Sequence, residues 1–385
     1  MITNTPKDLL CFSHLRWDFV FQRPQHLMTR FAERGNVYFL EEPVFDNPDK
    51  PYLSFKKKQA GLWVCLPHLP VGSTPDDIIK MMNILLVTFF EKRDCSNFIF
   101  WYYTPMAYEF SGMFAPAITV YDCMDELAAF AFAPPNIKYV EQKLLQKADL
   151  VFTGGVSLYE AKKNSHHNIH AFPSSIDKVH FGAARNNITP PADQAAISGI
   201  KLGFYGVIDE RFDQELIREI ANRRPDWHII LIGPVVKINP SKLPTADNIH
   251  YLGAKSYNEL PAYLSGWDVA MIPFLLNEST RFISPTKTPE YLAAGKPVVS
   301  SAIRDVVAPY EEMGLVSIGS DVELFIAAIE YELTNSADRQ WLKSVDEFLA
   351  DKSWEDTFSS MLQLMQKVWK ESKPVVLVRS LKNVS

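Results

Sequence analysis

The stretch SPTKTPEYLAAGKPVV, residues 284–299, contains the unit on which the fold is built. It connects two apolar runs, WDVAMIPF (267–274) and PVVSS (297–301), and short apolar runs of this kind are typical of buried strands. The segment between them predicts a short helix that ends at Gly295. Glycine readily adopts the left-handed conformation of a helix end, and Pro297 cannot continue the helix. A strand, a helix and a second strand in this order predict a parallel sheet.

Strands and helices alternate in the same way on both sides of this stretch. We expect further strands at 8–14, 36–43, 97–103, 117–123, 149–155, 201–207, 227–234 and 248–253, and helices at 25–35, 139–148, 212–224 and 257–266. Amphipathic patterns predict three more helices at 321–333, 339–350 and 354–370. The predicted fold class is therefore α/β, with two Rossmann-like, doubly wound parallel sheets.

The length of 385 residues is that of two ordinary domains. A run rich in Asn, Pro, Ala and Gly interrupts the alternation and predicts a connecting segment. We expect an N-terminal domain at 1–182, a linker at 183–199 and a C-terminal domain at 200–350, with the two domains facing a cleft. Residues 351–385 are expected to form a final helix and a tail, with the helix packing back on the N-terminal domain.

Charge and cysteine spacing argue against several kinds of partner. The formal net charge is −6, so we expect no nucleic-acid partner, although FKKK (55–58) is a local basic patch. Cys11, Cys65, Cys95 and Cys123 lie far apart and form no CxxC pair. This spacing disfavours a disulfide framework and a thiolate zinc site, and it predicts reduced core residues.

The N-terminus, MITNTPKDLLCFSH (1–14), lacks the basic and long apolar segments of a signal peptide, so we expect a cytoplasmic protein. The longest apolar segment, IIKMMNILLVTFF (78–90), is too short to span a bilayer. It follows TPDD, in which Thr74 is expected to cap a helix. We favour a buried helix here. The alternative is a surface that faces lipid or the acceptor, which would suit a peripheral protein at the inner face of the plasma membrane.

Ligands of open parallel sheets bind beyond the carboxyl ends of the strands, and residues 284–299 begin in such a loop. Free backbone N–H groups at Ser284 and Thr286, the helix dipole and the charge of Lys287 predict a site for a diphosphate. Glu290, about one turn later, offers two acceptor oxygens for the hydroxyls of a ribose. Together they predict a nucleotide site. The alternative is that Glu290 only complements the helix dipole and Lys287 is solvated.

Five stretches resemble GT-B glycosyltransferases, in particular bacterial retaining enzymes of glycosyltransferase family 4 that build surface polysaccharides. They are WDFVFQRPQHLMTRFAERG (17–35), VYDCMDEL (120–127), PSSIDKVHF (173–181), MIPFLLNESTRFIS (271–284) and PTKTPEYLAAGKPVVSS (285–301). The resemblance covers nearly the whole chain, and the order and spacing of the stretches make it specific. It implies a GT-B fold with the nucleotide sugar in the second domain.

The resemblance also assigns donor-site residues. Glu290 matches the ribose-binding glutamate, Thr286 and Lys287 match the diphosphate site, and Arg281 matches a further phosphate ligand. Gly206 falls at the turn after the first strand of the second domain, where the backbone must come close to the donor. The loop that contains Lys255 and Tyr257 falls where such enzymes hold the base.

Two positions depart from the family pattern. Retaining members often carry a glutamate eight residues before the ribose glutamate, and this chain has Phe282 there. Glu278 is close enough in sequence to substitute, and the alternative is a solvated loop glutamate. A histidine–aspartate pair at a strand end of the first domain is replaced by Tyr121 and Asp122. Both departures concern the donor sugar and the catalytic detail.

Loops after strands of the first domain supply catalytic candidates that would face the donor across the cleft: His14, Asp18, Asp122 and Asp125, beside Arg23, His26 and Glu126. In an inverting reaction one carboxylate or His14 would accept the acceptor proton. In a retaining reaction, which the resemblance favours, the donor phosphate would accept it and Lys287 would stabilise the leaving diphosphate. The alternatives are helix capping for Asp122 and Asp125, and packing or solvation of the first helix for Arg23 and His26.

We therefore expect a glycosyltransferase that moves a sugar from a UDP sugar to a glycan or lipid-linked glycan, with no other cofactor. No DxD motif is present, so we expect no metal. A non-hydrolysing sugar-nucleotide epimerase and a non-catalytic nucleotide-sugar or glycan-binding subunit remain as alternatives. A nicotinamide dehydrogenase is disfavoured, because no GxGxxG follows the first strand of either domain.

Overall fold

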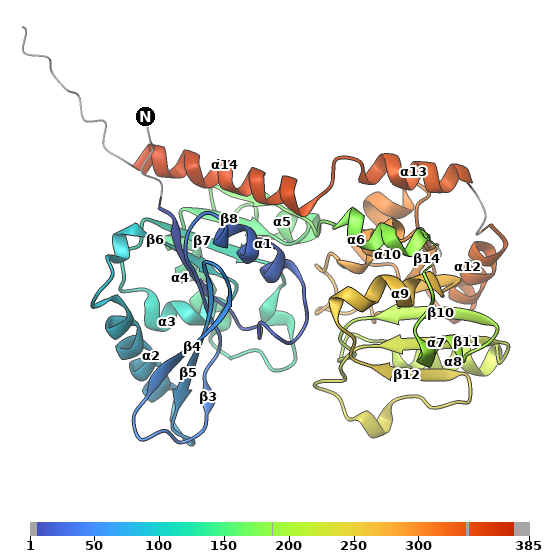
Figure 1. Ribbon diagram of the computed structural model, residues 1–385, viewed down its shortest axis with the longest axis horizontal. Coiled ribbons are helices and arrows are strands. Elements are labelled where there is room, and N and C mark those ends of the chain that lie inside the picture. Colours follow the sequence, from blue (N-terminus) through green and yellow to red (C-terminus); the bar gives the residue numbers. More distant parts are fainter. Residues whose placement is uncertain (1–5, 187, 336–338, 373–385) are drawn as a thin grey trace, which may run out of the picture.

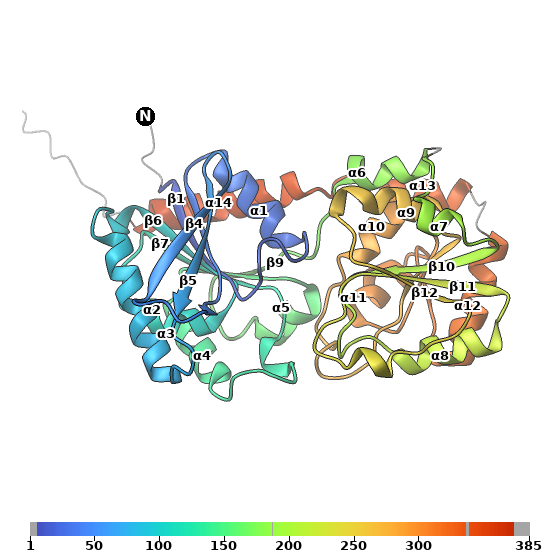
Figure 2. The same ribbon diagram turned by 60° about the horizontal axis from the view of Figure 1, so that its bottom comes forward.

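The computed structural model describes residues 6–186, 188–335 and 339–372, so the tail expected at 373–385 lies outside the described residues. The chain forms two α/β domains side by side, the N-terminal one at the left of Figure 1 and the C-terminal one at the right. Each contains a mainly parallel sheet with helices packed on it (Figure 1 and Figure 2), which confirms the predicted fold class.

The N-terminal sheet has the strand order β3-β5-β2-β1-β6-β7-β8-β9, with β4 paired to β5. Its strands are β1 (Asp8–Phe12), β2 (Val37–Leu40), β3 (Val44–Phe45), β4 (Tyr52–Gln59), β5 (Leu62–Leu69), β6 (Phe98–Tyr102), β7 (Ile118–Cys123), β8 (Leu150–Thr153) and β9 (Ile169–Ala171). Its helices are α1 (Arg23–Ala32), α2 (Pro75–Phe90), α3 (Tyr108–Ser111), α4 (Ile137–Lys147) and α5 (Val156–Lys162). Helix α6 (Lys178–Gly182) follows β9 and packs on the C-terminal domain (Figure 1).

The hairpin β4–β5 is the main element that the sequence did not predict. Its strands are antiparallel, whereas the other strand pairs described in this sheet are parallel. Gly61 at the turn has φ 73°, and a Cβ there would lie 2.4 Å from the carbonyl oxygen of Ala32. The basic patch 55–58 lies on β4, where Lys56 and Lys58 contact the carboxylate of Asp18.

Helix α2 is only half-buried. Thr74 caps it as predicted, because its side chain accepts the N–H of Asp77. Met82, Leu85, Leu86 and Phe89 are buried, whereas Ile84 and Val87 are exposed on the outer face. In the described part of the chain, no helix combines the length and apolar character needed to cross a membrane.

The C-terminal sheet has the order β12-β11-β10-β13-β14-β15, and its described strand pairs are all parallel. The strands are β10 (Ile200–Tyr205), β11 (Trp227–Ile232), β12 (Ile249–Gly253), β13 (Val269–Ile272), β14 (Val298–Ser300) and β15 (Ser317–Ile318). The helices are α7 (Ala192–Ala195), α8 (Gln214–Arg223), α9 (Leu260–Ser265), α10 (Lys287–Ala293), α11 (Arg304–Val306), α12 (Val322–Asn335) and α13 (Arg339–Leu349). Gly295 has φ 70°, so the left-handed end predicted after α10 is present.

Two segments that follow one domain in the sequence pack on the other domain. Ile176 and Phe181, which precede the linker, are buried in the core of the C-terminal domain. The expected linker also packs there, since Gln194 is buried and its side chain donates to the carbonyl of Tyr263 at 2.8 Å. Helix α14 (Trp354–Ser372) returns to the N-terminal domain, along the top of Figure 1, where Trp354 and Met361 join its core.

The four cysteines are free, and Cys11, Cys65 and Cys123 are buried. Cys95 is partly exposed. The expectation of core positions is therefore confirmed for three of the four.

Candidate active site

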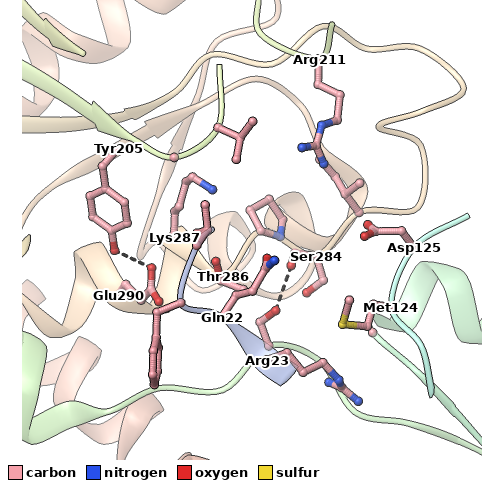
Figure 3. Close-up of a pocket in the computed structure, with 18 of the residues that line it drawn as sticks. Gln22, Arg23, Met124, Asp125, Tyr205, Arg211, Ser284, Thr286, Lys287 and Glu290 are labelled. Carbon is pink, nitrogen blue, oxygen red and sulfur yellow. Dashed lines mark hydrogen bonds between the residues drawn. The ribbon is translucent and has the colours of Figure 1, made fainter. Parts of the chain in front are cut away.

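A cavity of about 170 Å³ lies between the domains and receives side chains from both (Figure 3). The C-terminal domain contributes most of the predicted donor residues, namely Gly206, Tyr257, Ser284, Thr286, Lys287 and Glu290. The N-terminal domain contributes Asp125 and the loop after β1. The residues of the opening stretch therefore lie together at the carboxyl edge of the sheet, where ligands of such folds bind.

Glu290 lies on the first turn of α10 and is 8% exposed. The Tyr205 hydroxyl, from the end of β10, donates a hydrogen bond to its carboxylate, as the dashed line in Figure 3 shows. Burial raises the pKa of Glu290 to about 7, against the opposing effects of the Tyr205 hydrogen bond and of Lys287. The carboxylate is thus held in place by one donor and is poorly solvated.

Lys287 is the first residue of α10, and its side chain reaches into the cavity beside Glu290 (Figure 3). Burial lowers its pKa to about 8, although Glu290 favours the charged form. Gly206 makes room for it, because a Cβ at position 206 would lie 2.2 Å from Lys287 Cε, and the φ of 142° there suits glycine. The alternative of a solvated Lys287 does not match this position.

Arg211 is a cavity residue that the sequence reasoning missed. It lies in the loop after β10, and its guanidinium donates to both carboxylate oxygens of Asp209, at 3.0 and 2.6 Å. The positive charge of Arg211 lowers the pKa of Lys287. It also lowers the pKa of Asp125, which burial raises. Ligands of such sheets bind beyond the strand ends, so the cation in this loop could have been identified as a candidate from the sequence.

Lys255 and Tyr257 line an adjoining cavity of about 550 Å³, together with Asp18 and Phe21 of the N-terminal domain. The ring of Tyr257 stacks on His180 with centroids 4.2 Å apart and contacts the ring of Phe21 at 4.5 Å. Lys255 pairs with Asp193 at 2.7 Å. The loop predicted to hold the base therefore opens towards the first domain.

Two predicted donor-site residues, Arg281 and Glu278, lie elsewhere, and so does Phe282. Arg281 and Glu278 are exposed, pair with each other at 3.4 Å and line none of the cavities described above. Phe282, at the position of the missing glutamate, packs against an apolar cluster of the N-terminal domain. The departure from the family pattern thus coincides with a contact between the domains.

On the first-domain side, Asp125 and His14 line a third cavity, of about 600 Å³, which also includes Arg211. Burial raises the pKa of Asp125, and burial lowers the pKa of His14 to about 4, so the imidazole is neutral at pH 7. The buried Nδ1 of His14 has no hydrogen-bond partner among the described residues. His14 can therefore bond a ligand through Nδ1, and Asp125 lines the same cavity.

Asp122 and Asp18 occupy other surroundings. Asp122 is fully buried, and its two carboxylate oxygens accept hydrogen bonds from Arg23 at 2.8 and 3.0 Å. Asp18 is largely exposed and accepts from Lys58 at 2.6 Å. Glu126 pairs with Lys162 at 2.8 Å, and His26 stacks on Trp354 at 4.5 Å. Among the described residues, no cluster of three or more His, Cys, Asp or Glu side chains could hold a metal ion.

The chain is similar to known glycosyltransferases. Residues 202–335 match the family described as Glycosyl transferases group 1. The chain is 25% identical over 283 residues to TuaH of Bacillus subtilis (strain 168), a protein named as a teichuronic acid biosynthesis glycosyltransferase, covering 68% of this chain and 70% of that one.

Solved structures share the whole architecture. Sucrose-phosphate synthase from Thermosynechococcus elongatus matches with a TM-score of 0.70 at 16% identity, over 95% of this chain and 100% of that one. The E. coli trehalose-6-phosphate structure bound with UDP-2-fluoro glucose matches with a TM-score of 0.67 at 13% identity, over 93% and 99%. The chain therefore has the GT-B fold, and its residues 202–335 match a glycosyltransferase family.

Proposed function

We propose that the protein transfers a sugar from a UDP sugar to a glycan or lipid-linked glycan during synthesis of a cell-surface polysaccharide. The observation that carries this proposal is the interdomain cavity, in which Lys287 and Glu290 of one domain face Asp125 of the other. The name of the Bacillus subtilis relative supports the polysaccharide, and the UDP-2-fluoro glucose in the E. coli structure supports the donor.

The donor would be held by its two polar parts. Glu290 accepts from the ribose hydroxyls with the carboxylate oxygen that Tyr205 leaves free, while Lys287 and Arg211 bind the diphosphate. The base would occupy the adjoining cavity beside Tyr257. Gly206 allows the backbone to approach the diphosphate closely.

The transfer would proceed with retention of configuration and without a metal ion. Negative charge grows on the diphosphate as the glycosidic bond breaks, and Lys287 and Arg211 stabilise that charge in a site with little water. The departing phosphate oxygen accepts the proton of the acceptor hydroxyl. Asp125 and His14 orient the acceptor, since both line the third cavity and the Nδ1 of His14 has no hydrogen-bond partner among the described residues.

The third cavity is the proposed acceptor site. It is larger than the donor cavity, shares Arg211 and Asp125 with it, and carries the ring of Phe130. Lys237 and Arg211 of the other domain each lie 5.4 Å from the centre of that ring.

We further propose a cytoplasmic protein that contacts the inner face of the plasma membrane, with Ile84 and Val87 as exposed apolar side chains of the acceptor domain.

A screen of UDP, GDP and ADP sugars by thermal shift, with NAD as the control, tests the proposal. UDP sugars are expected to raise the melting temperature most, and slow hydrolysis of one of them would identify the donor. NMR of the released or transferred sugar then gives its anomeric configuration. A product of inverted configuration would contradict the retaining mechanism, and isomerisation of the UDP sugar without transfer would favour an epimerase.

A further inference from the structure

Helix α5 of the N-terminal domain begins without a cap of its own. Its N-cap residue is Gly155, which has no side chain to accept the N–H groups of the first turn. The carboxylate of Asp305, from α11 of the C-terminal domain, takes that role, because its Oδ1 accepts the N–H of Ser157 at 2.9 Å. Asp305 is buried, so this hydrogen bond is shielded from water.

The same point of contact is too tight for any side chain at position 155. A Cβ on Gly155 would lie 2.2 Å from Asp305 Oδ2 and 2.9 Å from Ser284 Cβ. The neighbouring Ser174, also from the N-terminal side, donates its hydroxyl to the carbonyl oxygen of Ser284 at 3.1 Å. Asp305, Gly155, Ser174 and Ser284 thus form one interdomain contact, which we call the Asp305 contact.

The Asp305 contact borders the donor cavity directly. Ser284 and Gly154 line that cavity, and the segment from Ser284 leads into Lys287 at the start of α10. Separation of the domains at this point would remove the cap of α5 and release Ser284. The position of the diphosphate-binding segment relative to the first domain is therefore linked to this contact.

We propose that Asp305 is a positioning residue that stabilises the arrangement of the two domains in this structure, here called closed, and fixes the Ser284–Lys287 segment against the acceptor domain. The inference rests on the proposed function for its effect on turnover, but its structural part is independent of the donor. Loss of a helix cap across an interface would shift the closed population by about three- to tenfold. Binding of UDP alone, whose proposed direct contacts are mostly in the C-terminal domain, would change little.

The test compares Asp305→Ala with three other variants. Asp305→Asn keeps an oxygen that can accept the N–H of Ser157 and should restore the parent behaviour. Gly155→Ala should mimic Asp305→Ala from the other side of the interface. Asp321→Ala is the matched control, because Asp321 accepts the N–H of Leu324 at 2.8 Å and caps α12 within one domain.

Small-angle scattering, with and without UDP, should give a larger radius of gyration for Asp305→Ala and Gly155→Ala than for the parent, Asp305→Asn and Asp321→Ala. Turnover should fall about tenfold in the first two variants while the Kd for UDP changes less than about threefold. The double variant should be no worse than either single one, since both remove one contact. A parent-like radius in Asp305→Ala, or an effect equal to that of Asp321→Ala, overturns the inference. If the parent protein does not bind UDP, the proposed function is contradicted instead. The radius of gyration measured without nucleotide still tests whether the Asp305 contact holds the domains together.

Discussion

The hydroxyl of Tyr205, at the end of β10, donates a hydrogen bond to the carboxylate of Glu290 on α10. The bond joins the first strand of the C-terminal domain to the helix that begins at Lys287. It leaves one oxygen of Glu290 available in the donor cavity, so the site is ordered before a ligand arrives.

UDP should stabilise the parent protein by about 2.7 kcal/mol at a hundredfold excess over its Kd. Glu290→Ala should remove most of the UDP-induced rise in melting temperature and leave the response to pyrophosphate nearly intact, because only the nucleoside half loses a partner. Thermal shift with both ligands measures this. Arg281→Ala is the control, since Arg281 is exposed and lines none of the cavities described above. A Glu290→Ala protein that responds to UDP like the parent would contradict the ribose assignment.

Glu290 should also lower the stability of the free protein at neutral pH. Its folded-state pKa of about 7 lies above the ordinary value of 4.5, so the folded protein binds the proton more tightly than the unfolded chain does. The stability that this proton contributes at low pH is lost as the pH rises from about 4.5 through 7. Glu290→Gln should therefore be more stable than the parent by roughly 1–3 kcal/mol at pH 8 and by much less at pH 5. Urea unfolding at the two pH values measures the difference in unfolding free energy between the variant and the parent. An equal gain at both pH values would contradict the raised pKa of Glu290.

Lys287 should contribute more to turnover than to donor binding, because the charge that it faces grows in the transition state. Lys287→Met should lower kcat clearly more than it raises the Kd for the donor. In the parent, the affinity for UDP should fall as the pH rises above about 8, where the free lysine loses its proton, and the variant should lack this dependence. Calorimetry in buffers of different ionisation enthalpy detects the accompanying proton uptake. A loss of affinity with unchanged turnover at saturation would make Lys287 an anchor only.

Asp122 and Arg23 should behave as a structural ion pair. Removing one partner leaves an uncompensated buried charge, so Arg23→Met should destabilise the protein by about 3–5 kcal/mol. Asp18→Asn, which loses only exposed pairs with Lys56 and Lys58, should change stability by less than about 1 kcal/mol. Chemical denaturation compares the two. An Arg23→Met protein that is as stable as the parent but inactive would instead favour a catalytic role for Asp122.

The repeating units of the fold were predictable because their signals are local. The apolar runs around 284–299, the stop at Gly295 and the Thr74 cap each depend on a few neighbouring residues, and the structure contains all of them. The grouping of Lys287 and Glu290 followed from the rule that ligands bind beyond the strand ends, and the place of Gly206 beside them followed from the family resemblance.

Features that depend on distant partners were not predictable. Asp122 looked like a strand-end candidate, but Arg23, 99 positions away, occupies both of its oxygens. Phe282 stands where retaining enzymes often carry a glutamate, and its packing against the other domain is visible only in the structure. The β4–β5 hairpin escaped notice because its outer strand carries lysines on a sheet edge, where the apolar pattern is weak.

Helix α14 has a consequence for how the chain is made. The core of the N-terminal domain includes Trp354, Phe358, Met361 and Met365, and the ring of Phe358 lies 4.8 Å from that of Phe31 on α1. On the ribosome these residues emerge only after the whole C-terminal domain has been synthesised. An apolar face of the nascent N-terminal domain therefore stays uncovered until then, while the C-terminal domain can fold first. Messages truncated before codon 354 should yield a chain that chaperones retain, even though both sheets are encoded in full.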